Sequence, residues 1–155
     1  MSLRRCTQLA LLTLAMCFPL LSQAEVQRRP YWTQLDAFFE SLEAGDAAKA
    51  VDRLSASSKY REVMLDELEN VILQLASLER RMGKYHSHER LIERIVADRY
   101  AYIYMFVAYD RQPLKMEFHF YRSEDEWRFQ NFSFSDKIDE DIVAAAQYEL
   151  LNEIW

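Results

Sequence analysis

The sequence predicts an α+β fold in which helices come first and an antiparallel sheet follows. Between Trp32 and Met82, apolar residues recur at the three- and four-residue spacing of amphipathic helices. After Gly83, aromatic and β-branched residues alternate with polar ones, which is typical of strands. The 131 residues from Glu25 to Trp155 suit a single domain.

Three helices are expected before Gly83. Gly45 favours the left-handed conformation that ends a helix, and Asp46 is placed to cap a short second helix. A polar break at 55–58 precedes a long third helix that begins near Tyr60. The three apolar stripes, expected to face the core, are Trp32, Leu35, Phe38, Phe39 and Leu42; Ala47, Ala50, Val51 and Leu54; and Met64, Leu68, Val71, Ile72, Leu75, Leu78 and Met82.

Three strands are expected after Gly83, and a further segment, 88–96, fits either a helix or a buried strand. In the last strand the apolar positions change parity near Gln130 and Asn131, so we expect a bulge there and a strongly curved sheet. Asp139 could cap a C-terminal helix, 139–154, which would pack on the open side of the sheet or reach a partner. The strands of this meander are 100–109, 114–121 and 127–134.

Alternation along the strands separates two faces of the sheet. The aliphatic positions, such as Ile103 and Leu114, should lie against the helices. The opposite face is too polar for a core and too aromatic for plain exposure to solvent, a composition typical of protein interfaces. The predicted interface residues are Tyr102, Tyr104, Glu117, His119 and Tyr121.

Residues 1–24 have the pattern of a cleavable secretory signal. Arg4 and Arg5 precede an apolar run at 9–21, and Ser22-Gln23-Ala24 offers small residues for cleavage. The run is shorter than the ~20 residues of a membrane-spanning helix, so no stable membrane anchor is expected after cleavage. We therefore expect a periplasmic or secreted protein with residues 25–155 as its single domain.

Composition excludes several classes of function. Cys6 and Cys17 both lie in the signal, so the mature domain has no thiol for a disulfide, a metal or nucleophilic catalysis. Without Arg4 and Arg5, 17 basic and 25 acidic residues give a formal charge of −8, which disfavours nucleic acid as a partner. The chain has 2 glycines, too few for a glycine-rich phosphate loop, and no cofactor is predicted.

The order of elements and several short motifs resemble the nuclear transport factor 2-like, or cystatin-like cone, superfamily, and in particular small secreted proteobacterial proteins of undefined activity. The resemblance covers roughly 32–136. It implies helices packed on a strongly curved antiparallel sheet, often with dimerisation through the sheet face. The similar motifs are Phe38–Asp46, Gly83, Pro113-Leu114, Phe118–Arg122, Trp127-Arg128-Phe129 and Phe132–Asp136.

The resemblance leaves the chemistry open, because this fold hosts enzymes and binding proteins alike. Enzymes of ketosteroid isomerase type use an acid and a tyrosine inside the cone, where a small apolar ligand could also bind; Tyr100, Phe39, Trp127 and Asp136 are the candidate pocket residues. No acid is paired with a donor at a recognisable spacing. His86 and His88 lack a third metal ligand, so no metal site is predicted.

The sequence therefore favours a non-catalytic binding or protein-interaction module, with a homodimer through the sheet face as one arrangement. An enzyme of ketosteroid isomerase type is the alternative. A small, acidic, exported chain also fits an immunity or inhibitor protein, although no residue points to a particular toxin.

Overall fold

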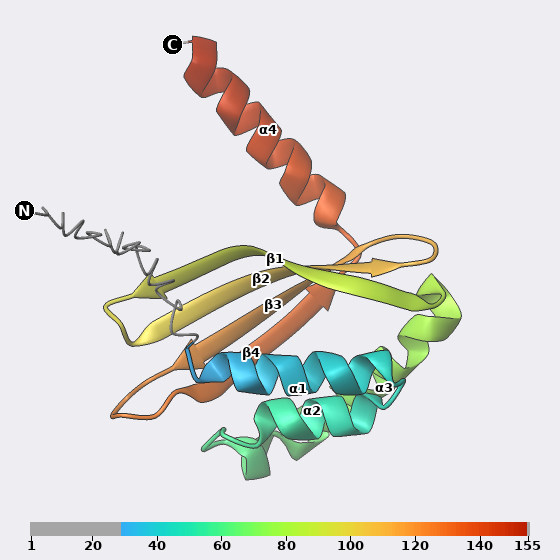
Figure 1. The fold of residues 1–155 in the computed structure, drawn as a ribbon, viewed down its shortest axis with the longest axis vertical. Helices are drawn as coiled ribbons and strands as arrows, with labels where there is room; N and C mark the ends of the chain where they lie inside the picture. Colours follow the sequence, from blue (N-terminus) through green and yellow to red (C-terminus); the bar gives the residue numbers. More distant parts are fainter. Residues whose placement is uncertain (1–28, 155) are drawn as a thin grey trace, which may run out of the picture.

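A computed structural model describes residues 29–154 of the chain, so the predicted signal at 1–24 lies outside the described residues. Helices precede strands, as the sequence predicts, and one further helix follows the sheet (Figure 1). The helices before the sheet are α1 (Tyr31–Glu43), α2 (Ala47–Ser55), the short 3₁₀ helix η1 (Arg61–Met64) and α3 (Leu65–Met82).

The helix ends follow the capping residues. Gly45 has φ +75° after α1, and the Asp46 carboxylate accepts the backbone N–H of Lys49 at 2.9 Å to cap α2. The third predicted helix begins near Tyr60, as expected, but its first turn is the 3₁₀ helix η1; α3 follows and ends at Gly83, whose φ is +85°. The predicted boundaries of the first two helices are confirmed.

The sheet has four antiparallel strands in the order β1-β2-β3-β4. The ambiguous segment 88–96 is a strand, part of the longer β1, and the last strand carries the predicted bulge, with Gln130 as the extra residue. Two further register irregularities lie in β1, at His86 and at Leu91. The strands are β1 (Tyr85–Val96), β2 (Tyr100–Tyr109), β3 (Leu114–Tyr121) and β4 (Arg128–Ser135).

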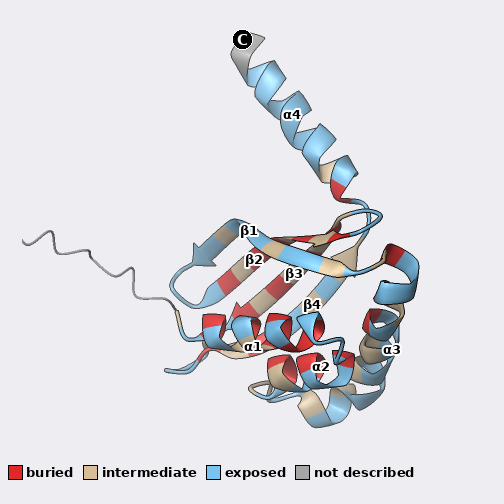
Figure 2. Ribbon diagram, turned by 45° about the vertical axis from the view of Figure 1, so that its right-hand side comes forward, coloured by how far each residue is buried: buried red, intermediate tan, exposed pale blue. Residues whose placement is uncertain are grey.

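The core lies between the sheet and the helices α1 to α3, which cover one face of the sheet (Figures 1 and 2). Its largest fully buried side chains include Tyr31, Phe38, Phe39, Phe118 and Phe120. These rings pack edge to face or stacked, with centroid distances of 5.1 to 5.8 Å, the separation that aromatic pairs prefer. The space under the sheet is therefore filled by side chains.

The last helix, α4 (Ile138–Ile154), leaves the end of β4 and projects away from the body on the side opposite α1 to α3 (Figure 1). Ile138 is buried at its start, and residues 142–152 are exposed along the helix (Figure 2). Of the two arrangements expected for this helix, packing along the sheet is not seen beyond its first turn, and reaching a partner stays a prediction. Asp139 lies in the first turn and not before it, so it is not the cap.

Candidate interaction surface

One face of the sheet is left uncovered by α1 to α3, and we call it the open face. The register of β2 on β3 is regular over eight pairs, so alternation holds without interruption and places Tyr102 beside His119 and Tyr104 beside Glu117. The five predicted interface residues share this face, together with side chains that the register adds from the neighbouring strands. The open-face residues are Ser87, Glu89, Ile92, Arg94, Val96, Tyr100, Tyr102, Tyr104, Phe106, Ala108, Lys115, Glu117, His119, Tyr121, Arg128, Asn131, Ser133 and Ser135.

His119 is the centre of an aromatic cluster on this face. Its Nδ1 lies 2.9 Å from the Tyr100 hydroxyl, and its ring centroid lies 5.2 Å from that of Tyr102. Burial lowers the pKa of His119, while the nearby Glu117 acts in the opposite direction. A neutral imidazole between two tyrosines can accept or donate a hydrogen bond without carrying charge into an interface.

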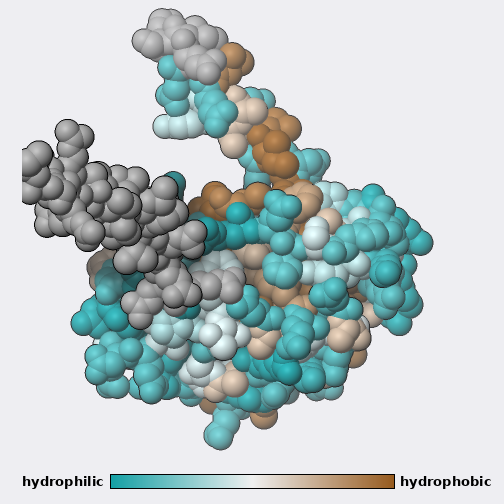
Figure 3. All heavy atoms as spheres, viewed as in Figure 1, coloured by the Kyte–Doolittle hydropathy of each residue, from teal (hydrophilic) through white to brown (hydrophobic). Residues whose placement is uncertain are grey.

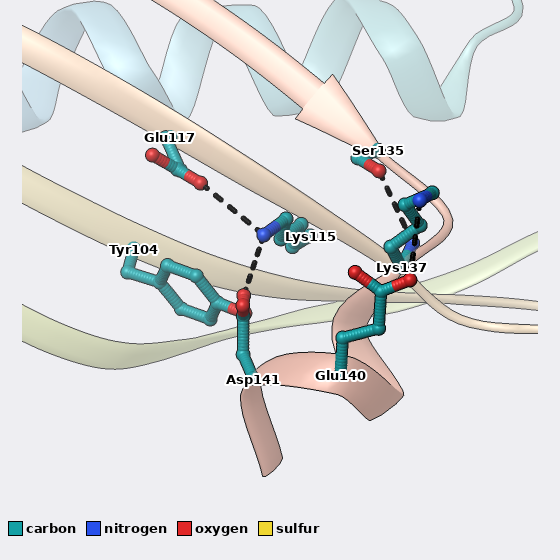
Figure 4. A network of polar contacts seen from close by, with 7 residues as sticks. All are labelled: Tyr104, Lys115, Glu117, Ser135, Lys137, Glu140 and Asp141. Atoms are coloured by element: carbon teal, nitrogen blue, oxygen red, sulfur yellow. Dashed lines mark hydrogen bonds and ion pairs between the residues drawn. The ribbon is translucent and has the colours of Figure 1, made fainter. Parts of the chain in front are cut away.

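A second cluster ties α4 to the sheet (Figure 4). The Asp141 carboxylate accepts hydrogen bonds from Lys115 Nζ at 2.6 Å and from the Tyr104 hydroxyl at 2.8 Å. Glu117 Oε1 lies 3.8 Å from the same Lys115 nitrogen. These contacts lower the pKa of Asp141, with the Lys115 hydrogen bond as the largest cause, and raise the pKa of Lys115. The first turn of α4 is thus anchored to the open face by a charged contact.

Beyond Asp141, α4 presents apolar side chains to solvent. Ile142, Val143, Tyr148, Leu150 and Leu151 are each more than half exposed. Figure 3 shows apolar atoms along α4 and on the body near its base. Within residues 29–154 no other element packs extensively on α4. Because a helix that is apolar on several sides is normally covered, this surface has the character of an unformed interface.

The two ends of this surface carry opposite charge. α4 contains Asp139, Glu140, Asp141, Glu149 and Glu153 and has no Lys or Arg. The end of the open face farthest from the start of α4 carries arginine instead, at Arg94 and Arg128, beside apolar and aromatic side chains. The exposed apolar residues at that end are Val96, Tyr100 and Tyr121.

The predicted pocket residues do not come together. Phe39 and Trp127 are buried in the core, 2% and 6% exposed, and Tyr100 lies on the open face instead. Asp136 is exposed and accepts a hydrogen bond from Gln112 Nε2 at 3.2 Å. Phe38 and Phe129 fill the same interior as Phe39 and Trp127. These four predicted residues therefore do not form an acid–tyrosine pair inside the sheet.

The two strand histidines diverge. His86 Nε2 lies 2.6 Å from Asp110 Oδ1, whereas the His88 ring stacks on Phe39 with centroids 3.9 Å apart. No group of three or more potential ligands in the part of the chain that the structure describes is arranged to hold a metal ion. Among helices of the same residues, none has the length and apolarity needed to cross a bilayer.

Sequence reasoning missed the role of Lys115 and Asp141. Nothing in the sequence distinguishes the two from other polar residues of a strand and a helix, and their contact spans 26 positions in the chain. Alternation placed Lys115 on the open face, but no local pattern shows which carboxylate it meets. The acidic first turn of α4 was the available signal, because three carboxylates there must lie near cations or solvent.

No family model and no curated protein matches the chain. A crystal structure from Campylobacter jejuni, described as a "putative NTF2-like transpeptidase", is similar over 63% of this chain and 94% of that chain, at 19% sequence identity and a TM-score of 0.46. A likeness at this level of identity and overlap assigns neither a family nor an activity to this chain.

Proposed function

We propose that this protein is an exported, non-catalytic interaction module that forms a homodimer through its open face and α4. The observation that carries the proposal is the run of five exposed apolar side chains on a helix whose base is fixed to a bare aromatic sheet face. Full burial of one such side chain is worth about 1.5–3 kcal/mol, so covering this helix would stabilise an assembly substantially.

Charge supports a second copy as the partner. In a two-fold dimer each surface meets its own copy in the opposite direction. The acidic, apolar α4 of one chain would then lie over the arginine-bearing end of the open face of the other, where Arg94 and Arg128 flank Val96 and Tyr121. The same contact would form twice, since each chain has both an α4 and an arginine-bearing end of the open face.

Sedimentation velocity over a micromolar concentration series tests the dimer. We expect the exported protein to sediment as a dimer, and Tyr121→Asp or Leu150→Asp to shift it to a monomer. Arg94→Glu should weaken the dimer, and Glu149→Arg in the same chain should restore part of the affinity. Glu62→Arg, in η1 on the helical side, is the matched control and should change nothing.

A strictly monomeric protein at every concentration would contradict the dimer, and so would a dimer that none of the open-face and α4 variants perturbs. Removal of residues 142–155, the part of the chain after the Asp141 anchor, is a second test of the dimer. The truncated chain keeps the Asp141 anchor and should fold as a monomer.

We further propose export with cleavage after Ala24 and a sheet that curves strongly around the helices as in the nuclear transport factor 2-like cone. The bulges at Leu91 and Gln130 support the curvature, because a bulge bends its strand. Mass spectrometry of the protein from the periplasm checks the first claim: a mature N-terminus at Glu25 is expected, and retention of residues 1–24 would contradict it.

The alternative of an enzyme working inside the cone has less support. The interior that such an enzyme would use is occupied by Phe38, Phe39, Trp127 and Phe129, all under 7% exposed.

A further inference from the structure

A cavity of about 500 Å³ opens on the helical side of the molecule, away from the open face. It lies where the end of α1 meets α3 and where β1 begins beside the end of β2. Its volume falls in the range of small-molecule sites. The residues that matter here are Leu42, Leu75 and Leu78 on its apolar walls, and Glu43, Glu79, Tyr85 and Tyr109 as its polar groups.

Tyr109 has an unused hydroxyl in this cavity. The residue is 8% exposed, yet its hydroxyl makes no hydrogen bond to any residue in 29–154. The Tyr109 hydroxyl oxygen is nevertheless accessible to solvent. Its neighbour Tyr85, 5.7 Å away between ring centroids, uses its own hydroxyl to contact His88 Nδ1. Because the Tyr109 hydroxyl reaches solvent through the cavity and makes no internal hydrogen bond, it is available to a ligand.

The cavity also favours positive charge. Burial raises the pKa of Tyr109 to about 12, and the negative charge of Glu79 contributes to that rise; Glu43 acts on Tyr85 in the same way. Neither carboxylate forms an ion pair with another described residue. Lys84 also lines the cavity, so two carboxylates face one ammonium group there.

We propose that this cavity binds a small organic cation, a primary ammonium with a short apolar chain. The ammonium would donate hydrogen bonds to the Tyr109 hydroxyl oxygen and to the Glu79 carboxylate, and the two tyrosine rings would add cation–π attraction. The apolar chain would lie against Leu42, Leu75 and Leu78. This site requires no dimer, and it uses none of the open-face residues.

The test is a calorimetric or NMR titration of the exported protein with 1-pentylammonium. Uncharged 1-pentanol and anionic pentanoate, which share the chain but not the charge, are the matched probes. We expect pentylammonium to bind with saturation and the other two to bind at least about tenfold more weakly, as the loss of a hydrogen bond to a charged group implies.

Variants locate the site. Tyr109→Phe removes a hydroxyl that has no internal partner, so it should leave folding unchanged and weaken pentylammonium binding by about tenfold. Glu79→Gln should weaken it similarly, and Ala76→Leu, on the exposed rim of the cavity, should block it. The controls Tyr60→Phe and Glu62→Gln lie in or beside η1 and should bind as the unmodified protein does.

No saturable binding of pentylammonium would overturn the proposal. Equal binding of 1-pentanol, or equal binding by Tyr109→Phe with its fold verified, would overturn it as well. Tyr121→Asp separates this site from the proposed dimer, because that variant should lose dimerisation and keep pentylammonium binding. Failure of one proposal therefore leaves the other standing.

Discussion

Asp141 at the base of α4 accepts a hydrogen bond from Lys115 Nζ at 2.6 Å, across 26 positions of the chain. This contact and the Tyr104 hydroxyl hold the first turn of a helix whose residues 142–152 are exposed. Seventeen residues of helix extend about 25 Å at 1.5 Å per residue, so a small change at the anchor moves the far end considerably. The Asp141 anchor therefore sets where the apolar part of α4 is presented.

Replacing Asp141 by Ala should loosen α4 without unfolding the domain. Lys115 is 18% exposed and Asp141 44% exposed, so we expect the free energy of unfolding to fall by less than about 1 kcal/mol. Amide hydrogens of residues 142–152 should exchange faster. Hydrogen exchange with mass spectrometry measures this. Glu140→Ala, which removes an exposed contact to Lys137, is the control and should leave the exchange rates unchanged.

Protonation of His119 should destabilise the open face. Burial lowers the pKa of this imidazole below its usual value of 6.5, so the unfolded chain binds the proton more readily than the folded one. The stability that His119 contributes is present above the unfolded-state pKa and is lost as the pH falls below it and through the folded-state pKa. Added charge would also disturb the contact with Tyr100.

His119→Gln isolates this effect, because glutamine can bond to Tyr100 and does not titrate. The free energy of unfolding is measured in urea from about pH 7 to about pH 5, across the ordinary titration of histidine. This fall in pH should lower it more in the unmodified protein than in the variant. Parallel pH profiles for the two proteins would show that His119 does not contribute.

Glu93 on the core side of β1 is predicted to be the most costly carboxylate to remove near α1. It accepts hydrogen bonds from the Tyr31 hydroxyl at 2.5 Å and from Trp32 Nε1 at 3.1 Å, and Arg90 pairs with it. Tyr31 is 0% exposed, so Glu93→Ala leaves a buried hydroxyl without its acceptor, at a cost of about 1–3 kcal/mol.

Denaturant unfolding of Glu93→Ala, Tyr31→Phe and the double variant measures this coupling. The losses should not add, because both single changes break the same contact. Glu93→Gln keeps an acceptor oxygen and should lose less than Glu93→Ala. Additive losses would mean that the Tyr31 contact contributes little.

The contrast between Glu93 and the tyrosine face shows what the sequence could predict. β2 and β3 pair without a bulge, so alternation alone placed Tyr102, His119 and Tyr121 correctly. In β1, Leu91 is an extra residue that reverses the parity of everything after it, and Glu93 consequently points toward the helices. No local pattern reports such a shift. Its partner Tyr31 is 62 positions away, a separation that periodicity cannot bridge.

The cavity beside Tyr109 was missed for a related reason. It is built from the ends of α1, α3, β1 and β2, where four elements meet only after folding. Alternation did place Tyr109 on the same side as Ile103, but a core position in a strand gives no sign that its hydroxyl lies at the edge of a cavity.

Gly83 and Gly45 are a matched pair: Gly83→Ala should lower the free energy of unfolding far more than Gly45→Ala. Both have positive φ, +75° at Gly45 and +85° at Gly83, so both alanines carry a backbone cost; Gly83 also has ψ −162°, a region that is essentially restricted to glycine, so its backbone cost is the larger one. A Cβ on Gly45 would meet nothing within 4 Å, whereas one on Gly83 would lie 2.5 Å from Asp110 Cβ and 2.7 Å from Oδ2.

The Asp110 side chain cannot yield freely, because its carboxylate accepts the Lys84 N–H at 2.7 Å and contacts His86 Nε2 at 2.6 Å. Relieving the overlap means breaking these contacts, so Gly83→Ala should lose about 3 kcal/mol in total and Gly45→Ala only about 1. Urea unfolding of both variants with unchanged m-values measures the difference. Equal losses would show that Asp110 moves aside at little cost, and that the junction of α3 and β1 is less tightly packed than its contacts indicate.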